Sequence, residues 1–478
     1  MRQPGTPWGT RSADEGSVTV VSVVPIDTPS LGDRSYLVSD GEIAVVIDPQ
    51  RDIDRVLQLA GATGVRITQV FETHVHNDYV SGGLELARVA GADYLLAADD
   101  AGAFPRVGLG DRAVVQTGAL TVRALHTPGH TFTHLSYLVE AEGRPVGVFT
   151  GGSLLYGSTG RPDLLGPDAP PALVRAQYRS ARRLAAELPA DTPVYPTHGF
   201  GSFCSASQSE ADSSTLAQET RSNPVLTLDE DAYVGQLLAG LGAYPTYYAQ
   251  MAPVNRAGPA PVDLSPPVVA DVEQLRRRLA AGEWLVDLRP GRAFAHGHAA
   301  GTVSVGLDGN LATYLGWVMP WGTPVTLLGE TREQVAQAQR EMVRIGIDRP
   351  AAAATGSPSS WAGGAALRSF NTADFAALAA PPAVGEREVL DVRRNEEWRD
   401  SHVAGARHLP LHELPARLAE VPADKEIWVY CATGYRSAIA ASLLERAGRR
   451  VVMIDDEFAN AGAAGVTLAP GDFAEVSR

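Results

Sequence analysis

The sequence predicts a multidomain α/β protein. Its 478 residues are too many for one ordinary hydrophobic core, so about two to four domains are expected. Beyond residue 264, short apolar segments alternate with longer helical ones, a pattern typical of parallel sheets covered on both faces. Stretches rich in proline, glycine and alanine at residues 257–261 and 351–364 interrupt this pattern and indicate domain boundaries.

Composition excludes several classes of protein. The net charge of −15 argues against a nucleic-acid partner, and the absence of 18 consecutive apolar residues argues against a membrane partner. Two cysteines exclude a disulfide framework, and a free reactive thiol suits a cytoplasmic location. Residues 1–16 lack the apolar core of a signal peptide and are predicted to be a disordered tail. The oligomeric state stays open, homo-oligomers included.

One of the two cysteines, Cys431, lies between a predicted strand and a predicted helix. Residues 427–430 are an apolar run that predicts a buried strand, and residues 437–444 predict a helix. A cysteine at this point faces the helix N-terminus, where unpaired N–H groups favour a thiolate. The guanidinium of Arg436 is expected to favour the same negative charge. Cys431 is therefore predicted to be a nucleophile for covalent sulfur chemistry.

Two other interpretations apply to a cysteine in such a loop. A free cysteine is often only a buried apolar filler. A cysteine phosphatase also ends its loop in arginine, but it needs five residues between the two to surround a phosphate. Here four intervene, which makes a smaller ring of N–H donors that suits one extra sulfur atom; they are Ala432, Thr433, Gly434 and Tyr435.

The segments upstream of this loop add a family resemblance. They are Leu390-Asp391-Val392-Arg393, Glu396-Glu397-Trp398, His402-Val403-Ala404-Gly405-Ala406 and His408-Leu409-Pro410-Leu411. With the Cys431 loop, they resemble a rhodanese (sulfurtransferase) domain, predicted over residues 370–478. The resemblance implies that Cys431 carries a persulfide and that residues 432–436 cradle it. It also implies that Arg436 and the loop amides attract anionic donors such as thiosulfate.

An internal repeat precedes this domain. Asp287-Leu288-Arg289 matches Asp391-Val392-Arg393 at an offset of 104, and residues 298–301 match residues 402–405 at the same offset. Keeping that offset places Leu327 opposite Cys431, so the nucleophile is missing. Residues 264–365 are therefore predicted to form a second rhodanese-like domain that is catalytically inactive.

The first 256 residues follow a different pattern. Strands are predicted at residues 18–24, 36–38, 43–47 and 67–71, with a helix at residues 52–61. Histidines follow predicted strand ends: His74 and His76 after the strand at 67–71, His130 after residues 120–125, and His198 after a further strand. Such imidazoles can converge on one point, which suggests a metal site.

This histidine pattern resembles the metallo-β-lactamase fold, an αββα sandwich, over residues 17–256. Within that fold it resembles the glyoxalase II and persulfide dioxygenase branch, whose members are known fused to rhodanese domains. The segments that carry the narrower match are residues 149–155, residues 160–164 and His198-Gly199-Phe200-Gly201-Ser202-Phe203-Cys204. Within the last of these, Cys204 is interpreted as a packed thiol.

Two positions depart from the family motif. The family has a histidine where this chain has Tyr79, and an aspartate where it has Gly152. The resemblance implies that this aspartate completes a two-histidine, one-carboxylate Fe(II) site in persulfide dioxygenases and bridges two metals in other relatives. Without it a two-metal site is not expected, and on this interpretation Gly152→Asp should raise iron occupancy.

Three arrangements of the site stay open. His74, His76 and His130 could hold one transition metal, Fe(II) or Zn(II), with water in the fourth position. A carboxylate, Asp78 or Asp163, could replace the missing ligand. The site could also hold no metal and only bind a thiol. Tyr79 is expected to fill the space of the lost histidine, and His198 to lie beside the site or in a second one.

These observations predict an enzyme of sulfide and persulfide metabolism. Sulfane sulfur would pass through Cys431, and the N-terminal domain would receive a low-molecular-weight thiol persulfide, with persulfide dioxygenase activity placed in question by Gly152. The first alternative is a glyoxalase II-like thioester hydrolase fused to a rhodanese domain. The second is a non-catalytic persulfide-binding scaffold.

Overall fold

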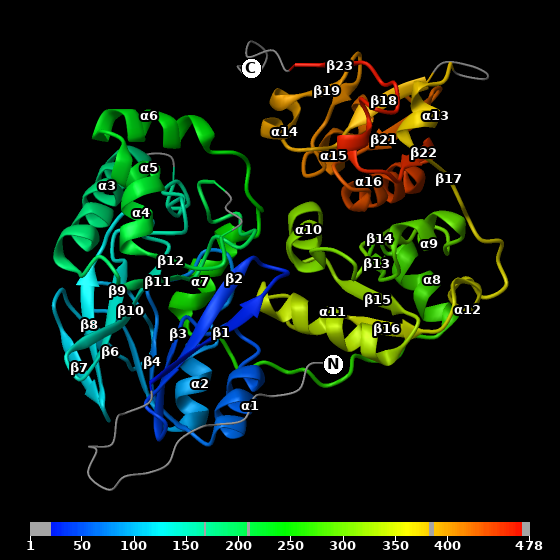
Figure 1. The fold of residues 1–478 in the computed structure, drawn as a ribbon. Coiled ribbons are helices and arrows are strands. Elements are labelled where there is room, and N and C mark those ends of the chain that lie inside the picture. The colour runs from blue at the N-terminus through cyan, green and yellow to red at the C-terminus, as the bar shows by residue number, and fades with distance from the viewer. Residues whose placement is uncertain (1–20, 167–168, 208–210, 382–386, 471–478) are drawn as a thin grey trace, which may run out of the picture.

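The computed structural model describes residues 21–166, 169–207, 211–381 and 387–470 (Figure 1). The predicted tail at residues 1–16 lies outside the described residues. Three units follow one another along the chain: an N-terminal sandwich up to residue 257, a middle unit over residues 268–362 and a C-terminal unit over residues 371–470. Figure 1 shows the sandwich on the left and the other two units stacked on the right.

The sandwich is built from two six-stranded sheets. In the first, the order is β1-β2-β3-β4-β5-β6, antiparallel up to β3 and parallel from there on. Its strands are β1 Ser22–Thr28, β2 Asp33–Ser39, β3 Ile43–Ile47, β4 Arg66–Phe71, β5 Asp93–Ala97 and β6 Val107–Leu109. Its helices are α1 Asp54–Thr63 and α2 Gly83–Ala90. Of the strand predicted at residues 18–24, residues 18–20 lie outside the described residues; the remainder overlaps β1, which continues to Thr28.

The second sheet has the order β12-β11-β10-β9-β8-β7. Its strands are β7 Val114–Thr117, β8 Leu120–His126, β9 Leu135–Ala141, β10 Arg144–Gly151, β11 Pro193–Pro196 and β12 Ser214–Thr215. Its helices are α3 Pro170–Glu187, α4 Leu216–Ser222, α5 Pro224–Thr227 and α6 Glu230–Gly240, and α7 Tyr248–Ala257 leads out of the sandwich.

Three apolar layers hold the sandwich together. Side chains such as Val38, Phe71, Val122 and Phe149 pack between the two sheets. A second layer lies under α1 and α2, and a third lies under α3 to α6. Because both faces of each sheet are buried, the layers follow the predicted αββα order. Polar side chains lie in the loops after β4, β8, β10 and β11, outside these apolar layers.

The middle unit is a parallel sheet with the order β14-β13-β15-β16. Its strands are β13 Trp284–Asp287, β14 Val303–Ser304, β15 Val325–Gly329 and β16 Ala352–Thr355. Its helices are α8 Val272–Ala280, α9 Gly291–His296, α10 Leu311–Val318, α11 Arg332–Arg344 and α12 Pro358–Ala362.

The C-terminal unit has a parallel sheet with the order β17-β22-β21-β18-β20. Its strands are β17 Asn371–Ala373, β18 Arg387–Asp391, β20 Arg407–His408, β21 Glu426–Tyr430 and β22 Arg450–Ile454, with a separate pair β19 His402–Val403 and β23 Leu468–Ala469. Its helices are α13 Phe375–Ala379, α14 Asn395–Asp400, α15 Leu414–Arg417, η1 Leu418–Glu420, α16 Tyr435–Arg446 and η2 Phe458–Asn460.

The internal repeat is visible in the hydrogen bonds of these two units. Arg289 donates to the carboxylate of Asp287 and to a backbone carbonyl eight residues on, and Arg393 makes the same bonds with Asp391 and with residue 401. His298 and His402 each bond through Nδ1 to the carbonyl oxygen four residues earlier and stack on that residue's aromatic ring. The two units therefore share one local architecture.

The register of the sheets corrects the predicted counterpart of Cys431. Asp391 pairs with Tyr430, the residue before Cys431, whereas Asp287 pairs with Leu328. Gly329, and not Leu327, therefore occupies the position of Cys431. The constant offset failed because the middle unit has two residues more between its two central strands: Asp287 and its partner Leu328 are 41 positions apart, whereas Asp391 and Tyr430 are 39 apart. The described loop between β15 and α11 still contains no cysteine.

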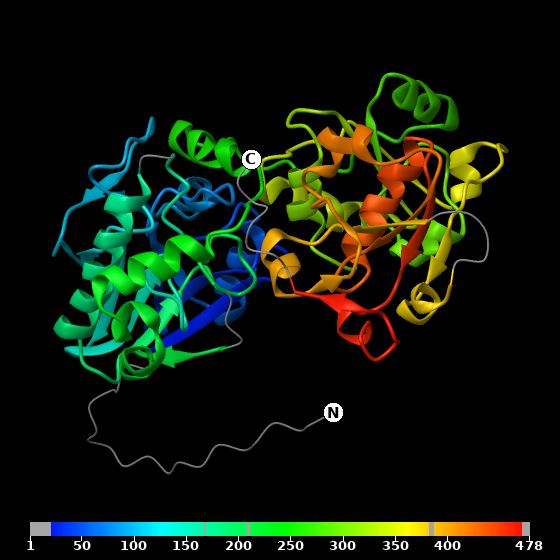
Figure 2. The same cartoon turned by 90° about the horizontal axis from the view of Figure 1, so that it is seen from above.

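The three units are joined by packing and by ion pairs. The largest apolar core includes residues of both β/α units, among them Val303 and Ile439. The two units lie one above the other in Figure 1 and overlap in the view from above in Figure 2. The middle unit meets the sandwich through arginine–aspartate pairs, namely Arg51–Asp348, Arg340–Asp54 and Arg344–Asp52.

Candidate functional site

The loops after β4, β8 and β11 bring the four predicted histidines together. Ring centroids lie 4.1 Å apart for His74 and His76, 4.7 Å for His74 and His130, and 5.2 Å for His130 and His198. All four side chains are buried. Each follows a strand end, as the sequence predicts, because neighbouring strands of the two sheets end at the same edge.

Hydrogen bonds leave the Nε2 atoms of three rings available. The hydroxyl of Thr73 donates to Asp48, so His74 must donate its Nδ1–H to that hydroxyl, at 2.9 Å. His130 donates Nδ1–H to the carbonyl oxygen of Arg161 at 2.8 Å, and its Nε2 has no partner among the described residues. His198 donates Nδ1–H to Asp33 at 2.8 Å. Metal-binding histidines are commonly oriented in this way.

His76 is oriented by two carboxylates. Its Nε2 lies 3.1 Å from Glu72 and 3.3 Å from Asp48, and its Nδ1 has no partner within the described chain. Burial alone would lower its pKa, but Asp48 and Glu72 raise the pKa to about 9. The nitrogen that could bind a metal is thus Nδ1.

The separation of two ring nitrogens fits one metal ion. His74 Nε2 lies 3.4 Å from His198 Nε2. Zinc–nitrogen bonds of about 2.0–2.1 Å in a tetrahedron place two ligand nitrogens about 3.3–3.4 Å apart. Among the described residues, donor atoms within 4.8 Å of one another form four groups: His74, His76, His198; His130, His198, Cys204; Asp33, Asp78, His198; and Asp48, Glu72, His76. His198 therefore belongs at the centre of the cluster, and these residues fit a single transition metal.

The carboxylates proposed as substitute ligands have other partners. Asp78 lies 3.1 Å from His198 Nδ1, and although burial alone would raise its pKa, His198 lowers it below the ordinary value. Asp163 forms two hydrogen bonds with Arg161 and belongs to none of the candidate metal groups of the described residues. Tyr79 is fully buried and stacks on His76, and its hydroxyl lies 3.0 Å from His76 Nε2.

The space beside Gly152 is filled by His130. A Cβ atom added to Gly152 would lie 2.3 Å from Cδ2 of the His130 ring, and one added to Gly160 would lie 2.6 Å from its Nδ1. The two glycines therefore hold the imidazole between them. In this chain the His130 ring occupies space that the side chain of an aspartate at position 152 would need.

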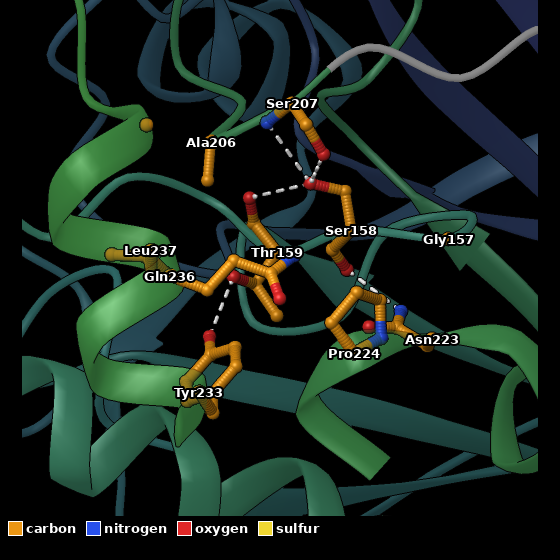
Figure 3. Close-up of a pocket in the computed structure, with 11 residues that line it drawn as sticks. Gly157, Ser158, Thr159, Ala206, Ser207, Asn223, Pro224, Tyr233, Gln236 and Leu237 are labelled. Carbon is orange, nitrogen blue, oxygen red and sulfur yellow. Dashed lines mark hydrogen bonds between the residues drawn. The ribbon is translucent and has the colours of Figure 1, made fainter. Parts of the chain in front are cut away.

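The histidine cluster is nearly closed. The cavity that reaches His74 and His76 has a volume of about 10 Å³, room for about one water molecule. A larger cavity of about 170 Å³ lies nearby between Ser158, Asn223 and Tyr233 (Figure 3). It is smaller than the usual ligand pocket of about 300 Å³ or more, and none of the four histidines lines it.

The Cys431 loop has the predicted strand–loop–helix form. Cys431 follows β21, and α16 begins four residues later. The N–H of Gly434 donates to Sγ of Cys431 at 3.2 Å, and Ser437 Oγ lies 3.8 Å from the same sulfur. Gly434 has φ 99°, a conformation that suits glycine and aims its N–H at the sulfur. Cys431 is nearly fully buried at 1% exposure.

Arg436 is held by the carboxylate of Glu397, for which the sequence alone predicts no role. Its two terminal nitrogens bond to the two oxygens of Glu397 at 2.6 and 2.7 Å. Burial alone would raise the pKa of Glu397, but Arg436 lowers that pKa to about 2. Arg436 therefore stands beside the loop as half of an ion pair and not as a free cation.

The middle unit lines the space next to Arg436. A cavity of about 10 Å³ lies between Tyr314, Trp317, His412 and Arg436. Trp317 of α10 stacks on His412, with centroids 4.7 Å apart, and meets Phe203 of the sandwich edge-on at 4.9 Å. All three units thus contribute to the surroundings of the Cys431 loop.

Several residues of these sites carried no usable signal in the sequence. Asp33 lies 165 residues before His198, and Glu397 lies 39 residues before Arg436. Asp48 follows β3 and reaches His76 from that separate strand, whereas Glu72 precedes His76 by only four residues. Among the described helices, none has both the length and the apolar character required to cross a membrane.

Comparison with known proteins identifies two regions of the chain. Residues 33–198 match the metallo-beta-lactamase superfamily, and residues 374–461 match the rhodanese-like domain. A probable metallo-hydrolase of Burkholderia pseudomallei is 32% identical over 231 residues, which cover 40% of this chain and 75% of that protein. A hydroxyacylglutathione hydrolase of Anaeromyxobacter dehalogenans is 40% identical over 127 residues, which cover 26% of this chain and about half (48%) of the relative.

A solved structure extends the similarity beyond the sandwich. A metallo-beta-lactamase from Staphylococcus aureus superposes with a TM-score of 0.64 at 26% identity, and it covers 71% of this chain and 100% of its own. Residues 1–256 are only 256 of 478, so the likeness extends beyond the sandwich. The fold is therefore a metallo-β-lactamase sandwich followed by α/β units with parallel sheets.

Proposed function

Because the chain belongs to the metallo-β-lactamase superfamily and carries a rhodanese-like domain at residues 374–461, we propose that it transfers sulfane sulfur through a persulfide on Cys431. The observation that carries the proposal is the hydrogen bond from the Gly434 N–H to Sγ of Cys431 at the N-terminus of α16. Backbone N–H groups at a helix N-terminus stabilise an anionic sulfur.

The transfer divides into two displacements. The Cys431 thiolate attacks the outer sulfur of a donor such as thiosulfate, so that one S–S bond forms, the S–S bond of the donor breaks and sulfite leaves. An acceptor nucleophile then takes the outer sulfur and regenerates the thiolate. Neither step requires an added oxidant or reductant. Glu397 holds Arg436 in position at the loop, where the pair orients the donor without leaving an unpaired buried charge.

The sandwich is proposed to bind one transition metal among the four clustered histidines, His74, His76, His130 and His198. A metal here would polarise a sulfur substrate or lower the pKa of bound water. Imidazoles and no carboxylate at position 152 favour Zn(II) over Fe(II). The proposed substrate of this domain is a low-molecular-weight thiol persulfide.

Thiosulfate:cyanide transfer tests the principal proposal. The wild type should form sulfite and thiocyanate, and after incubation with thiosulfate alone the intact protein should gain the mass of one sulfur atom. Cys431→Ser should lose both properties, whereas Cys204→Ser should keep them. Full activity in Cys431→Ser would overturn the proposal.

Thioester hydrolysis is a second candidate for the sandwich, and the similarity to hydroxyacylglutathione hydrolases favours it. The two activities differ in their need for oxygen. Hydrolysis of a glutathione thioester without oxygen uptake would support a hydrolase, and oxygen uptake with glutathione persulfide would support an oxygenase. Persistence of either activity in Cys431→Ser would assign it to the sandwich.

A further inference from the structure

The second cysteine lies within the histidine cluster. The thiol of Cys204 is fully buried, and its sulfur lies within 4.8 Å of ring nitrogens of His130 and His198, which lie equally close to each other. Because Nδ1 of His130 is bonded to the Arg161 carbonyl, the nitrogen that faces this group is Nε2. That Nε2 is buried and has no hydrogen-bond partner among the described residues.

The backbone holds Cys204 and His130 against each other. The N–H of Arg161 donates to the carbonyl oxygen of Cys204 at 2.7 Å, and the carbonyl oxygen of Arg161 accepts the Nδ1–H of His130 at 2.8 Å. The N–H of Cys204 donates to Ser202 Oγ at 3.2 Å. One residue therefore positions both side chains, as outer-shell partners do around metal ligands.

A thiolate ligand would supply the negative charge that the missing carboxylate at position 152 would otherwise provide. Three imidazoles are neutral, so a metal bound to them alone keeps its full charge in a buried site. Among the described residues, the candidate group that contains both His130 and His198 also contains Cys204, whose thiolate would be an anionic ligand. Asp33 and Asp78 are carboxylates, but they face Nδ1 of His198.

We propose that Cys204 is a metal ligand, and that its thiolate binds one Zn(II) ion together with His130 and His198. His74, whose Nε2 lies 3.4 Å from that of His198, borders the same site, and the fourth position would stay open for water or substrate. The inference rests on the metal-binding part of the proposed function and is independent of sulfur transfer at Cys431.

The thiolate and imidazole ligands determine which metal is preferred. Binding replaces the S–H bond of Cys204 with a sulfur–metal bond and releases one proton to solvent, with no change of oxidation state. Thiolate and imidazole ligands suit zinc, whereas non-haem Fe(II) oxygenases use two histidines and a carboxylate. Full-length protein should therefore retain zinc in preference to iron.

Cobalt substitution tests the proposal. Full-length wild type loaded with Co(II) should bind about one equivalent and show a near-ultraviolet sulfur-to-cobalt charge-transfer band. Since the chain has only two cysteines, Cys431→Ser is the matched control and should keep the band, while Cys204→Ser should lose it. Bound Co(II) without this band, or a band lost only in Cys431→Ser, would overturn the inference and leave the metal site in place.

A measurement on the wild type covers the case in which Cys204→Ser does not fold. Zinc X-ray absorption of the full-length protein should show one sulfur at about 2.3 Å and nitrogen ligands at about 2.0–2.1 Å. A shell without sulfur would overturn the assignment of Cys204. Failure to bind Zn(II) or Co(II) at all would overturn this inference and the metal part of the proposed function, but would not affect the Cys431 assay.

Discussion

The imidazole of His130 lies where a side chain on Gly152 would have to be. The sequence alone suggested that Gly152→Asp would raise iron occupancy, and the structure gives a steric reason to expect a different result. An aspartate Cβ would lie 2.3 Å from the His130 ring, which Gly160 confines on its other side. We expect Gly152→Asp to displace His130, to lower the free energy of unfolding by about 1–3 kcal/mol and to leave iron content unchanged.

Elemental analysis and thermal unfolding of Gly152→Asp measure these effects. Gly110→Asp is the control, because a Cβ at Gly110 meets no atom within 4 Å. It should leave both stability and metal content as in the wild type. A gain of iron in Gly152→Asp without loss of stability would show that His130 can move aside.

The Glu397–Arg436 pair predicts a pH dependence at the level of single residues. Arg436 lowers the pKa of Glu397 from its ordinary 4.5 to about 2. A lowered folded-state pKa means that the stabilisation is complete above about pH 4.5 and is lost as the pH falls toward 2. We expect Glu397→Gln to be less stable than the wild type at pH 7, with a difference that shrinks below pH 4.5.

Thermal unfolding of both proteins between pH 7 and 3 measures this difference. Glu396→Gln is the control, because Glu396 is more exposed and pairs with Arg394 at the surface. It should show a small difference that changes little with pH. A Glu397→Gln difference that stays constant down to pH 3 would contradict the assigned ion pair.

At the level of elements, the start of α16 depends on one left-handed residue. Gly434 has φ 99°, and its N–H reaches the sulfur of Cys431. Alanine at a left-handed position costs about 1–2 kcal/mol, and relaxation of the backbone would turn the N–H away from the sulfur. We expect Gly434→Ala to lose stability by about that amount and to lose most of the thiosulfate:cyanide activity.

Gly448, which follows the same helix, separates the two effects. It also has a positive φ, 77°, but no atom would lie within 4 Å of its Cβ and it is distant from the sulfur along the chain. Gly448→Ala should lose a similar amount of stability and keep its activity. Equal activity in the two variants would contradict the role of the Gly434 N–H.

Strands and helices were predictable from the sequence where the residues of one segment by themselves indicate its structure. The strand at 427–430, the helix after it and the strand at 43–47 agree with β21, α16 and β3, because apolar runs and the loop chemistry between them are local. The histidines were predictable for the same reason, since each directly follows a strand.

What remained hidden depended on contacts between segments. Glu397 lies 39 residues before Arg436, and Asp33 lies 165 residues before His198. The counterpart of Cys431 was misplaced by two residues because a constant offset cannot detect that the connection in the middle unit is two residues longer. The sequence predicts only a packed thiol at Cys204, because a buried cysteine has the same local pattern in a core and in the cluster of ligands proposed above.

On the scale of the whole molecule, a buried ion pair joins the sandwich to the middle unit. Arg344 of α11 donates Nε and Nη2 to the two oxygens of Asp52, at 3.1 and 2.7 Å, and both side chains are buried. Arg55 also lies 2.8 Å from this carboxylate. Neutralising Asp52 would leave two arginines facing each other without a counter-charge.

Asp52→Asn should therefore weaken the contact between the two units. Removal of one partner of a buried pair costs about 3–5 kcal/mol, so we expect the thermal transition to fall and limited proteolysis between residues 257 and 268 to become faster. Asp54→Asn is the control, because Asp54 is 41% exposed and pairs with a partly exposed Arg340. It should cost at most about 1 kcal/mol. If both variants resist protease equally well, apolar packing and not Asp52 holds the units together. The contact between Phe203 and Trp317 beside the Cys431 loop would then depend on that packing alone.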